Sequence, residues 1–329
     1  MGRDEAGPPS GTIGARMAQA LGTITIDIDP VLHLGGLAIH WYGVMYAVAF
    51  ATAYQFGAMP YMRARGIPRE MSERIVMWVI VFGLLGARLY YVVQNEPPQG
   101  GSWFSHPQEI VAVWHGGMAF FGAIIAAFVT MGVLAWRYRL DFWVIADSGA
   151  IFAVIGQPIG RIGNIINGDI LGAPSSLPWA TAYTNANAVL QKGFFLGQPY
   201  QPAGAYELIG TLIIGAMLYT VLRRGVPRGT LWITYLALYS VSQFIIFFWR
   251  TSEPTVALGL KQAQWTAIVQ LLVAVPLMIW IRRRSLLDFS TAEQNSTAEP
   301  DGAPESPSPA PPRSEPATAR ATGGRDDLT

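Results

Sequence analysis

The sequence predicts an all-α polytopic membrane protein with seven transmembrane helices, its N-terminus outside and its C-terminus in the cytoplasm. Three observations lead to this fold class. Hydrophobic residues make up 51% of the chain and charged residues only 13%, about half the charged share of a typical soluble domain. Apolar stretches close to the length that crosses a bilayer recur along the chain. Arginines gather in alternate loops between these stretches.

Seven apolar stretches are candidates for the spanning helices, because about 20 apolar residues cross a bilayer. They are roughly 38–58, 75–94, 115–136, 142–160, 204–222, 229–249 and 264–281. The fourth departs most from a plain apolar span, since it contains Asp147 and continues into a glycine-rich motif.

Basic residues set the orientation of the spans. They follow spans one, three, five and seven, as Arg63, Arg65, Arg69, Arg74, Arg137, Arg139, Arg223, Arg224, Arg228, Arg282, Arg283 and Arg284. The alternate loops are nearly free of them: 95–114 has none and 167–203 has only Lys192. The positive-inside rule therefore puts the arginine-rich loops in the cytoplasm.

Composition divides the chain into three regions. Residues 1–29 are predicted to be an extracytoplasmic N-terminal segment, whose first part lacks the apolar core of a secretory signal. Residues 30–285 are predicted to form the seven-helix transmembrane domain. Residues 286–329 are rich in Pro, Ala, Ser, Thr and acidic residues, so they are expected to be a disordered cytoplasmic tail.

Several classes of site are excluded or unsupported. The chain has no cysteine, which excludes a disulfide framework, a thiolate metal site and a cysteine nucleophile. Any thiol chemistry must then use a thiol of the substrate. The four histidines form no spaced metal-ligand pair, and serine-hydrolase, zinc-protease and nucleotide-binding motifs are missing. We expect no metal, no cofactor and no nucleic-acid partner.

The most informative feature is the motif GRIGNIINGDILG at residues 160–172, at the outer end of the fourth span. It brings Arg161, Asn164, Asn167 and Asp169 next to the membrane, where polar groups are costly and usually mark a functional site. Its four glycines predict a bent backbone rather than one continuous helix.

Each polar residue of the motif has a functional and a structural interpretation. The forked donors of Arg161 match a lipid phosphate, or the side chain anchors the helix end by snorkelling. Asn164 and Asn167 offer hydrogen bonds to a glycerol or an ester, or they cap the helix. Asp169 is either a general base or an ion-pair partner of Arg161.

Three more charged residues lie within apolar spans. Glu207, near the start of the fifth span, is an acid/base or site-organising group, or the structural partner of an arginine. Arg88 in the second span and Arg250 at the end of the sixth lie toward the outer half by the orientation argument. With Arg161 they would place three guanidiniums around one site for a phospholipid.

Four aromatic or imidazole residues open or line spans. His40 and His115 begin the first and third spans, and Tyr42 and Tyr239 lie in the first and sixth. Their ordinary interpretation is that of interfacial residues in an aromatic belt. A role in the site remains open for them.

The motif GRIGNIINGDILG resembles the signature of the prolipoprotein diacylglyceryl transferases, which is close to G-R-x-G-N-F-x-N-x-E-x-x-G. Other stretches resemble the same family over roughly residues 30–285. They are AIHWYGVMYAVAF, GLLGARLYYVV, WHGGMAFFGAIIA, AYELIG and FFWRTSEPTVALGLKQAQW.

The resemblance implies a seven-span enzyme of the bacterial cytoplasmic (inner) membrane. Such an enzyme transfers the diacylglyceryl group of phosphatidylglycerol to the lipobox cysteine thiol of prolipoproteins, in lipoprotein maturation. The product is a thioether, and glycerol phosphate is released. The implied partners are phosphatidylglycerol, prolipoprotein signal peptides and the bilayer.

The resemblance also assigns roles residue by residue. The residues implied to be catalytic are Arg161, Asp169, Glu207, Tyr239 and Arg250. Those implied to bind substrate are Arg161, Asn164, Asn167, Gly172, Tyr42, Arg88 and His115.

The chain departs from the family pattern at five positions, which are Asp169 for glutamate, Ile165 for phenylalanine, Phe121 for histidine, Gln243 for arginine and Phe247 for glutamate. Phe121 leaves the general base open between Asp169, Glu207 and His115. Two other functions stay open: a lipid-headgroup hydrolase or transferase that uses water or an alcohol, and a non-catalytic paralogue that binds or transports lipid.

Overall fold

The computed structural model describes residues 23–97, 100, 102–112, 117–250 and 255–297. The chain divides into one unit at Met1–Ser285 and a second at Leu286–Thr329. The fold below is that of the first unit. Of the second unit, only the end of the last helix falls among the described residues.

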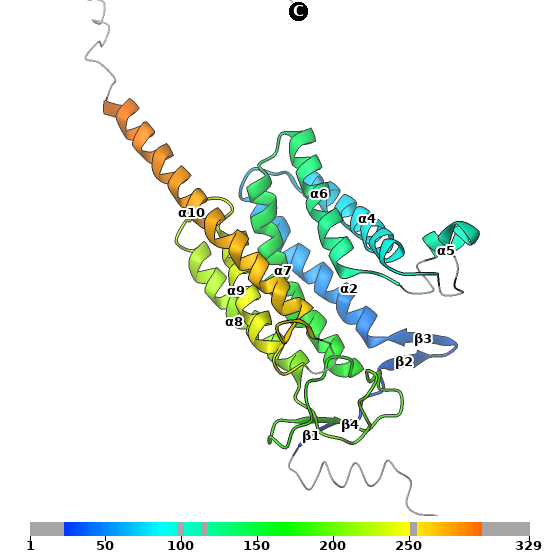
Figure 1. Cartoon of the computed structure of the whole chain (residues 1–329). Coiled ribbons are helices and arrows are strands. Elements are labelled where there is room, and N and C mark those ends of the chain that lie inside the picture. The colour runs from blue at the N-terminus through cyan, green and yellow to red at the C-terminus, as the bar shows by residue number, and fades with distance from the viewer. Residues whose placement is uncertain (1–22, 98–99, 101, 113–116, 251–254, 298–329) are drawn as a thin grey trace, which may run out of the picture. The chain divides into compact units, whose positions relative to one another are not determined.

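Helices make up most of the first unit (Figure 1). They are α2 (Trp41–Ala53), the π-helix η1 (Tyr54–Ala58), α3 (Met59–Arg63), α4 (Arg69–Gln94), the 3₁₀ turn η2 (Trp103–Ser105), α5 (Pro107–Val111), α6 (Phe120–Tyr138), α7 (Phe142–Asn167), α8 (Ala203–Leu222), α9 (Thr230–Ile246) and α10 (Gln262–Thr297).

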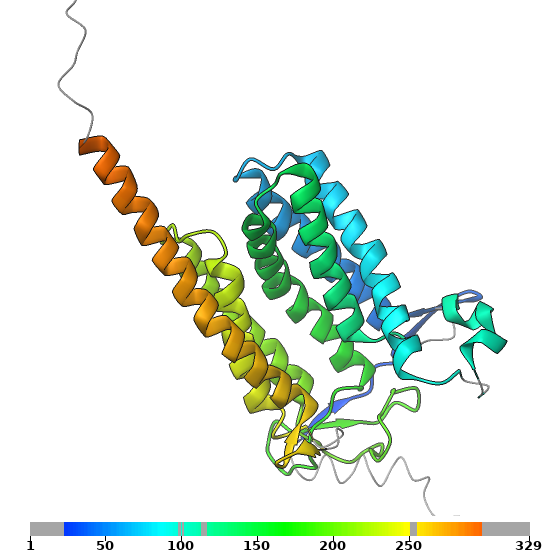
Figure 2. The same cartoon turned by 45° about the horizontal axis from the view of Figure 1, so that its top comes forward.

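Short strands add to the predicted all-α architecture. They are β1 (Ile24–Ile26), β2 (Val31–Leu34), β3 (Leu37–His40), β4 (Thr181–Tyr183), β5 (Thr255–Ala257) and β6 (Leu260–Lys261). β1 pairs with β4 in parallel, whereas β2–β3 and β5–β6 are antiparallel. In Figures 1 and 2 they lie at one end of the helices.

Five helices are long and apolar enough to cross a membrane: 69–94, 121–138, 142–167, 203–222 and 262–284. The chain is therefore a helical, polytopic membrane protein, as predicted. The sixth predicted span is the apolar but shorter α9. The first is divided by the π-helix between α2 and α3. The count of seven spans and the orientation stay predictions.

α7 is the central helix of this unit. It packs against α2, α8 and α9. In the most apolar 18-residue stretch of α7, 44% is buried inside the protein. The corresponding share in the other four long helices is 17–22%. In the glycine motif at its end, Gly160, Gly163, Asn164 and Asn167 are buried, whereas the other long helices leave most of their apolar surface uncovered by protein.

Asp147 explains how the fourth span tolerates a carboxylate. Its Oδ2 accepts hydrogen bonds from the backbone N–H of Gly229 (2.7 Å) and the hydroxyl of Tyr61 (3.0 Å), and its Oδ1 accepts one from the N–H of Trp232 (2.8 Å). These N–H groups belong to the first turn of α9, which lacks intrahelical acceptors. The aspartate thus fixes the start of α9 against α7.

Candidate active site

The glycine motif is helical over more of its length than the sequence predicts. α7 continues to Asn167 and ends where Gly168 adopts φ +82°, a left-handed conformation that favours glycine. The prediction of a bent backbone is wrong for 160–167. The reason is packing: a Cβ on Gly163 would lie 2.9 Å from the Cβ of Met45 on α2, so this glycine permits close helix contact.

The end of α7 brings three polar residues of the motif together. Arg161 and Asn164 are three residues apart and share one helix face. The turn at Gly168 then returns Asp169 toward that face. Asn164 Nδ2 donates to both carboxylate oxygens of Asp169 (3.1 and 3.3 Å), and Arg161 Nη1 donates to Asn164 Oδ1 (3.3 Å).

Glu207 on α8 joins this group to Arg250. Its Oε2 lies 2.5 Å from Arg161 Nη2, and its Oε1 lies 3.6 Å from Arg250 Nη1. The Glu207 side chain is 1% exposed, whereas those of Arg161 and Arg250 are 22% and 12% exposed. A carboxylate this deeply buried requires cationic partners. We call Arg161, Asn164, Asp169, Glu207 and Arg250 the polar cluster.

α9 supplies an aromatic wall to the polar cluster. Arg161 hydrogen-bonds to Tyr239. The Tyr239 ring stacks on that of Tyr235, with centroids 5.5 Å apart and planes at 19°. The hydroxyl of Tyr235 accepts a hydrogen bond from Gln157 of α7 (2.8 Å). The stacking and the hydrogen bond therefore hold Tyr239 in place beside Arg161.

Two residues that the sequence did not single out hold the end of α9. The ammonium of Lys261 donates to the backbone carbonyls of Phe247 (2.5 Å) and Arg250. The amide of Gln264 donates to the carbonyl of Phe244 (3.2 Å). They satisfy carbonyls that have no intrahelical partner at a helix end. The signal was a lysine and a glutamine at the start of an apolar span.

Phe247 stands where the family pattern has a glutamate. The Arg250 guanidinium lies over its ring, 4.7 Å from the centroid. A cation above an aromatic face is attracted by the ring quadrupole. In this chain an aromatic ring therefore contacts the arginine at a position where the family carries a carboxylate.

Gly172 lies where two backbone segments meet. Its N–H donates to the carbonyl of Gln201 (2.8 Å), and the next N–H, of Ala173, donates to the carbonyl of Trp249 (2.9 Å). A Cβ on Gly172 would lie 2.8 Å from that same Trp249 oxygen. These contacts position the residue before Arg250. The predicted contact of Gly172 with substrate stays a prediction.

Asn167 and Tyr42 border the polar cluster. Asn167 is buried, and its carbonyl accepts a hydrogen bond from the N–H of Val189 (2.8 Å) in the loop that follows α7. Tyr42 on α2 packs against Tyr46, with ring centroids 4.6 Å apart. Tyr42 also interacts electrostatically with both Asp169 and Arg161.

The loop after α7 is fastened to the motif through Tyr183. Its hydroxyl donates to the carbonyl of Ile165 at 2.5 Å. Burial raises the pKa of Tyr183 above its ordinary value, so the hydroxyl keeps the proton that it donates. The parallel pairing of β1 with β4 ties the same loop to residues 24–26.

The sequence led us to expect the Arg88 guanidinium at one site with those of Arg161 and Arg250. Its hydrogen bonds are instead with a different segment. It is buried and donates to the carbonyls of Ile110 (3.0 Å), Gly117 (2.8 Å) and Glu109. It thus joins α4 to the segment around α5. The structure brings Arg161 and Arg250 onto one carboxylate, while Arg88 organises this other segment. His115 lies outside the described residues.

An apolar groove of about 280 Å³ lies beside the polar cluster, between α8 and α9. Ile209 and Ile213 line it from α8, and Ile245 lines it from α9. One end is formed by Tyr206, the residue before Glu207. A lipid chain in this groove would bring its polar end toward the cluster.

Comparison with known proteins identifies the family of the chain. The prolipoprotein diacylglyceryl transferase family matches residues 30–280. The chain is 34% identical over 266 residues to the phosphatidylglycerol–prolipoprotein diacylglyceryl transferase of Bordetella avium (strain 197N), which covers 79% of this chain and 97% of that relative. It is 32% identical to the Cupriavidus metallidurans protein of the same name, over 78% of this chain and 95% of that relative. The chain belongs to the prolipoprotein diacylglyceryl transferase family.

Proposed function

We propose that this protein transfers the diacylglyceryl group of phosphatidylglycerol to the lipobox cysteine thiol of prolipoproteins. The relatives carry the name of this activity. The observation that carries the proposal for the site is the polar cluster, in which two guanidiniums share one buried carboxylate at the end of the central helix. The named activity of the relatives does not favour the alternative of a non-catalytic lipid-binding or transport paralogue.

Arg161 and Arg250 bind the phosphodiester in this proposal. Each guanidinium presents five N–H donors in a planar fork whose geometry matches phosphate oxygens. The two arginines are also more exposed than the glutamate between them. The partly exposed guanidiniums of Arg161 and Arg250 present positive charge to an anionic headgroup. Donors held in place stabilise charge that develops on the leaving phosphate.

The reaction exchanges one bond at a glycerol carbon. The thiolate sulfur of the prolipoprotein attacks the carbon that bears the phosphate, so a C–S bond forms as the C–O bond breaks. The bonding electron pair leaves with glycerol phosphate. The thiol proton must go to a base, because the thiolate is the nucleophile. The chain supplies no cysteine of its own, which fits a thiol that arrives with the substrate.

Of the candidate bases on the described residues, Asp169 is the one that an incoming thiol reaches most easily. Glu207 is almost completely enclosed between two guanidiniums, so an incoming thiol does not reach it. Asp169 is half-buried and follows α7 beyond its last turn. Asn164 donates to its carboxylate and orients it. We therefore assign proton removal to Asp169 and the alignment of the two arginines to Glu207.

The other proposed binding residues surround this centre. Asn164, Asn167 and Tyr42 contact the glycerol or the ester groups, and Tyr239 supports Arg161. The groove between α8 and α9 takes an acyl chain, which brings the headgroup toward the cluster from the lipid side. Gly172, Arg88 and His115 remain proposed substrate contacts on the family resemblance.

We further propose seven spans, an outside N-terminus and a location in the bacterial cytoplasmic membrane. Support comes from the alternation of arginine-rich and arginine-free loops. This orientation places the polar cluster at the extracytoplasmic face, where secreted precursors emerge. Cysteine labelling of single-cysteine variants at residues 190 and 225 tests it, since only the first is then accessible from outside.

Rescue of a bacterial strain that lacks its own transferase tests the activity. We expect the full chain to restore the lipoprotein gel shift. Purified protein should convert phosphatidylglycerol and a lipobox peptide into a thioether of the expected mass. Release of free diacylglycerol alone would identify a headgroup hydrolase instead. Folded protein that gives neither product would support the non-catalytic alternative.

A further inference from the structure

A second groove lies between α9 and α10, away from the polar cluster. It is an apolar depression of about 240 Å³. It includes Ile233, near the amino end of α9, which is about 20 Å along the helix from Ile246. Gly229, just before α9, lies close to Ile281 of α10. The groove therefore belongs to the end of the α9–α10 pair opposite Arg250.

The groove has a buried floor and walls that face outward. Ile233 and Ala274 form the floor and are essentially inaccessible. Val275 and Ile279 form one wall and are 56% and 48% exposed. Ala237 leaves room on the α9 side because its side chain is a single methyl group. In a membrane protein such a surface lies against acyl chains.

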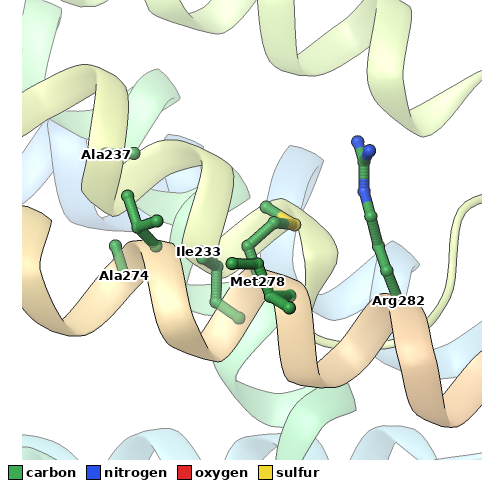
Figure 3. A pocket seen from close by; sticks show the side chains of 7 residues that line it. Ile233, Ala237, Ala274, Met278 and Arg282 are labelled. Carbon is green, nitrogen blue, oxygen red and sulfur yellow. The ribbon is translucent and has the colours of Figure 1, made fainter.

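One cation stands at the rim. Of the described residues that line the groove, Arg282 alone is charged. It follows Met278 by one helical turn, and Figure 3 shows both side chains on the same side of α10. Arg284, two residues later, instead lies over the ring of Trp280, 5.7 Å from the centroid. Of these two arginines, only Arg282 therefore belongs to the groove.

We propose that this groove binds one anionic glycerophospholipid, with its headgroup phosphate on Arg282 and one acyl chain along α10 toward Ala274. That stretch of helix is about 12 Å long. A guanidinium pairs with phosphate through charge-assisted hydrogen bonds, and a basic residue near the surface adds attraction for anionic lipid. The site is independent of the transfer reaction and lies at the other end of α9.

A lipid fits this groove better than a second copy of the chain does. In a two-fold dimer the same patch of both copies meets, so each copy would bring Arg282 to an interface whose groove residues include no carboxylate to pair with it. A stable protein interface also buries about 800 Å² on each partner, far more than a depression of this size offers. An anionic lipid supplies both the chain and the opposite charge.

Photolabelling tests the proposal with a lipid other than the transferase substrate. The purified full chain is mixed with phosphatidylserine that carries a diazirine in one acyl chain, and labelled peptides are mapped by mass spectrometry. We expect label on 233–237 and 274–279. Arg282→Ala should reduce it about fivefold, while the matched Arg284→Ala leaves it unchanged. Phosphatidylcholine with the same diazirine should label these peptides weakly.

A second variant probes the groove without touching the charge. Ala237→Leu narrows it, so label from phosphatidylserine should fall while thermal unfolding and transferase activity stay as in the wild type. Equal labelling of Arg282→Ala and Arg284→Ala overturns the proposal. So do equal labelling by both lipids and cross-links between two copies at these peptides. These readouts do not depend on transfer, so loss of transferase activity alone leaves the proposal standing.

Discussion

Arg161 of α7 and Glu207 of α8 form a buried ion pair, with Nη2 and Oε2 2.5 Å apart. The same carboxylate faces Arg250 through its other oxygen. Glu207 therefore determines the spacing of two guanidiniums that come from different parts of the chain. An arginine beside lipid is costly by itself, and this shared partner lets two of them remain at one site.

Arg161→Ala should abolish transfer. Loss of one donor to a developing oxyanion costs about 10²–10³ in rate, and this arginine also binds the ground-state phosphate. The protein should still insert, because Glu207 keeps Arg250 as a partner. Lipobox-peptide conversion measures the loss. Arg69→Ala is the matched control, since Arg69 forms an exposed pair with Glu73. Full activity of the Arg161 variant would remove the core of the proposal.

Glu207→Gln should lower kcat more than it raises KM for phosphatidylglycerol. The amide keeps the volume of the side chain but loses the charge that aligns Arg161 and Arg250, which then repel each other. Unfolding in detergent should begin at a lower temperature, since breaking one partner of a buried ion pair costs about 3–5 kcal/mol. An unchanged kcat together with an unchanged melting temperature would refute the aligning role.

Asp169→Asn should reduce kcat at least about 10²-fold, the usual contribution of a positioned base. Asp169→Glu restores the glutamate of the family pattern and keeps a carboxylate that can act as a base. Its kcat should therefore stay within about tenfold of the wild-type value. Comparison of these two variants separates proton removal from hydrogen bonding, because an asparagine side chain can still accept a hydrogen bond from Asn164 but cannot act as a base. A fully active asparagine variant would move the base to Glu207 or His115.

Phe247→Leu should weaken phosphatidylglycerol binding through Arg250. A desolvated cation–π contact contributes about 1–2 kcal/mol, so KM should rise about five- to thirtyfold with little change in kcat. Phe248→Leu is the control, since Phe248 lies just beyond α9, is exposed, and has its ring against Phe244, with centroids 5.4 Å apart. If both variants behave alike, the ring of Phe247 does not hold the guanidinium.

Asp147→Asn should destabilise the fold without altering the chemistry. The carboxylate accepts two backbone hydrogen bonds from the start of α9 and one from Tyr61. The amide leaves one of these donors unsatisfied, at a cost of about 1–3 kcal/mol. Thermal unfolding should shift downward, while activity per folded molecule stays within about twofold. A specific loss of kcat at full stability would place Asp147 in the catalytic machinery.

Much of this architecture follows from hydropathy alone. Each predicted span overlaps a helix or a helical run among the described residues, since apolar length is a strong signal. The sequence allowed two interpretations of Glu207, and one of them was the ion pair with an arginine that the structure shows. The sequence also indicated a role for the residues of the polar cluster, although their role in catalysis remains a prediction.

Other features depended on contacts between distant segments. Helix α7 passes through the glycine motif because α2 packs against Gly163, which no local propensity reveals. Arg88 binds carbonyls of residues 109, 110 and 117, and nothing in its own span identifies those partners. Lys261 caps α9 from across a loop. Such backbone acceptors carry no side-chain signature, so composition and periodicity do not locate them.

The hydrogen bond between Ala173 and the carbonyl of Trp249 has a mechanical consequence. It ties the segment that follows α7 to the residue before Arg250, so it restrains the distance between the two parts of the chain that carry the guanidiniums. We therefore expect a phospholipid headgroup to meet two guanidiniums whose spacing is largely set before it binds.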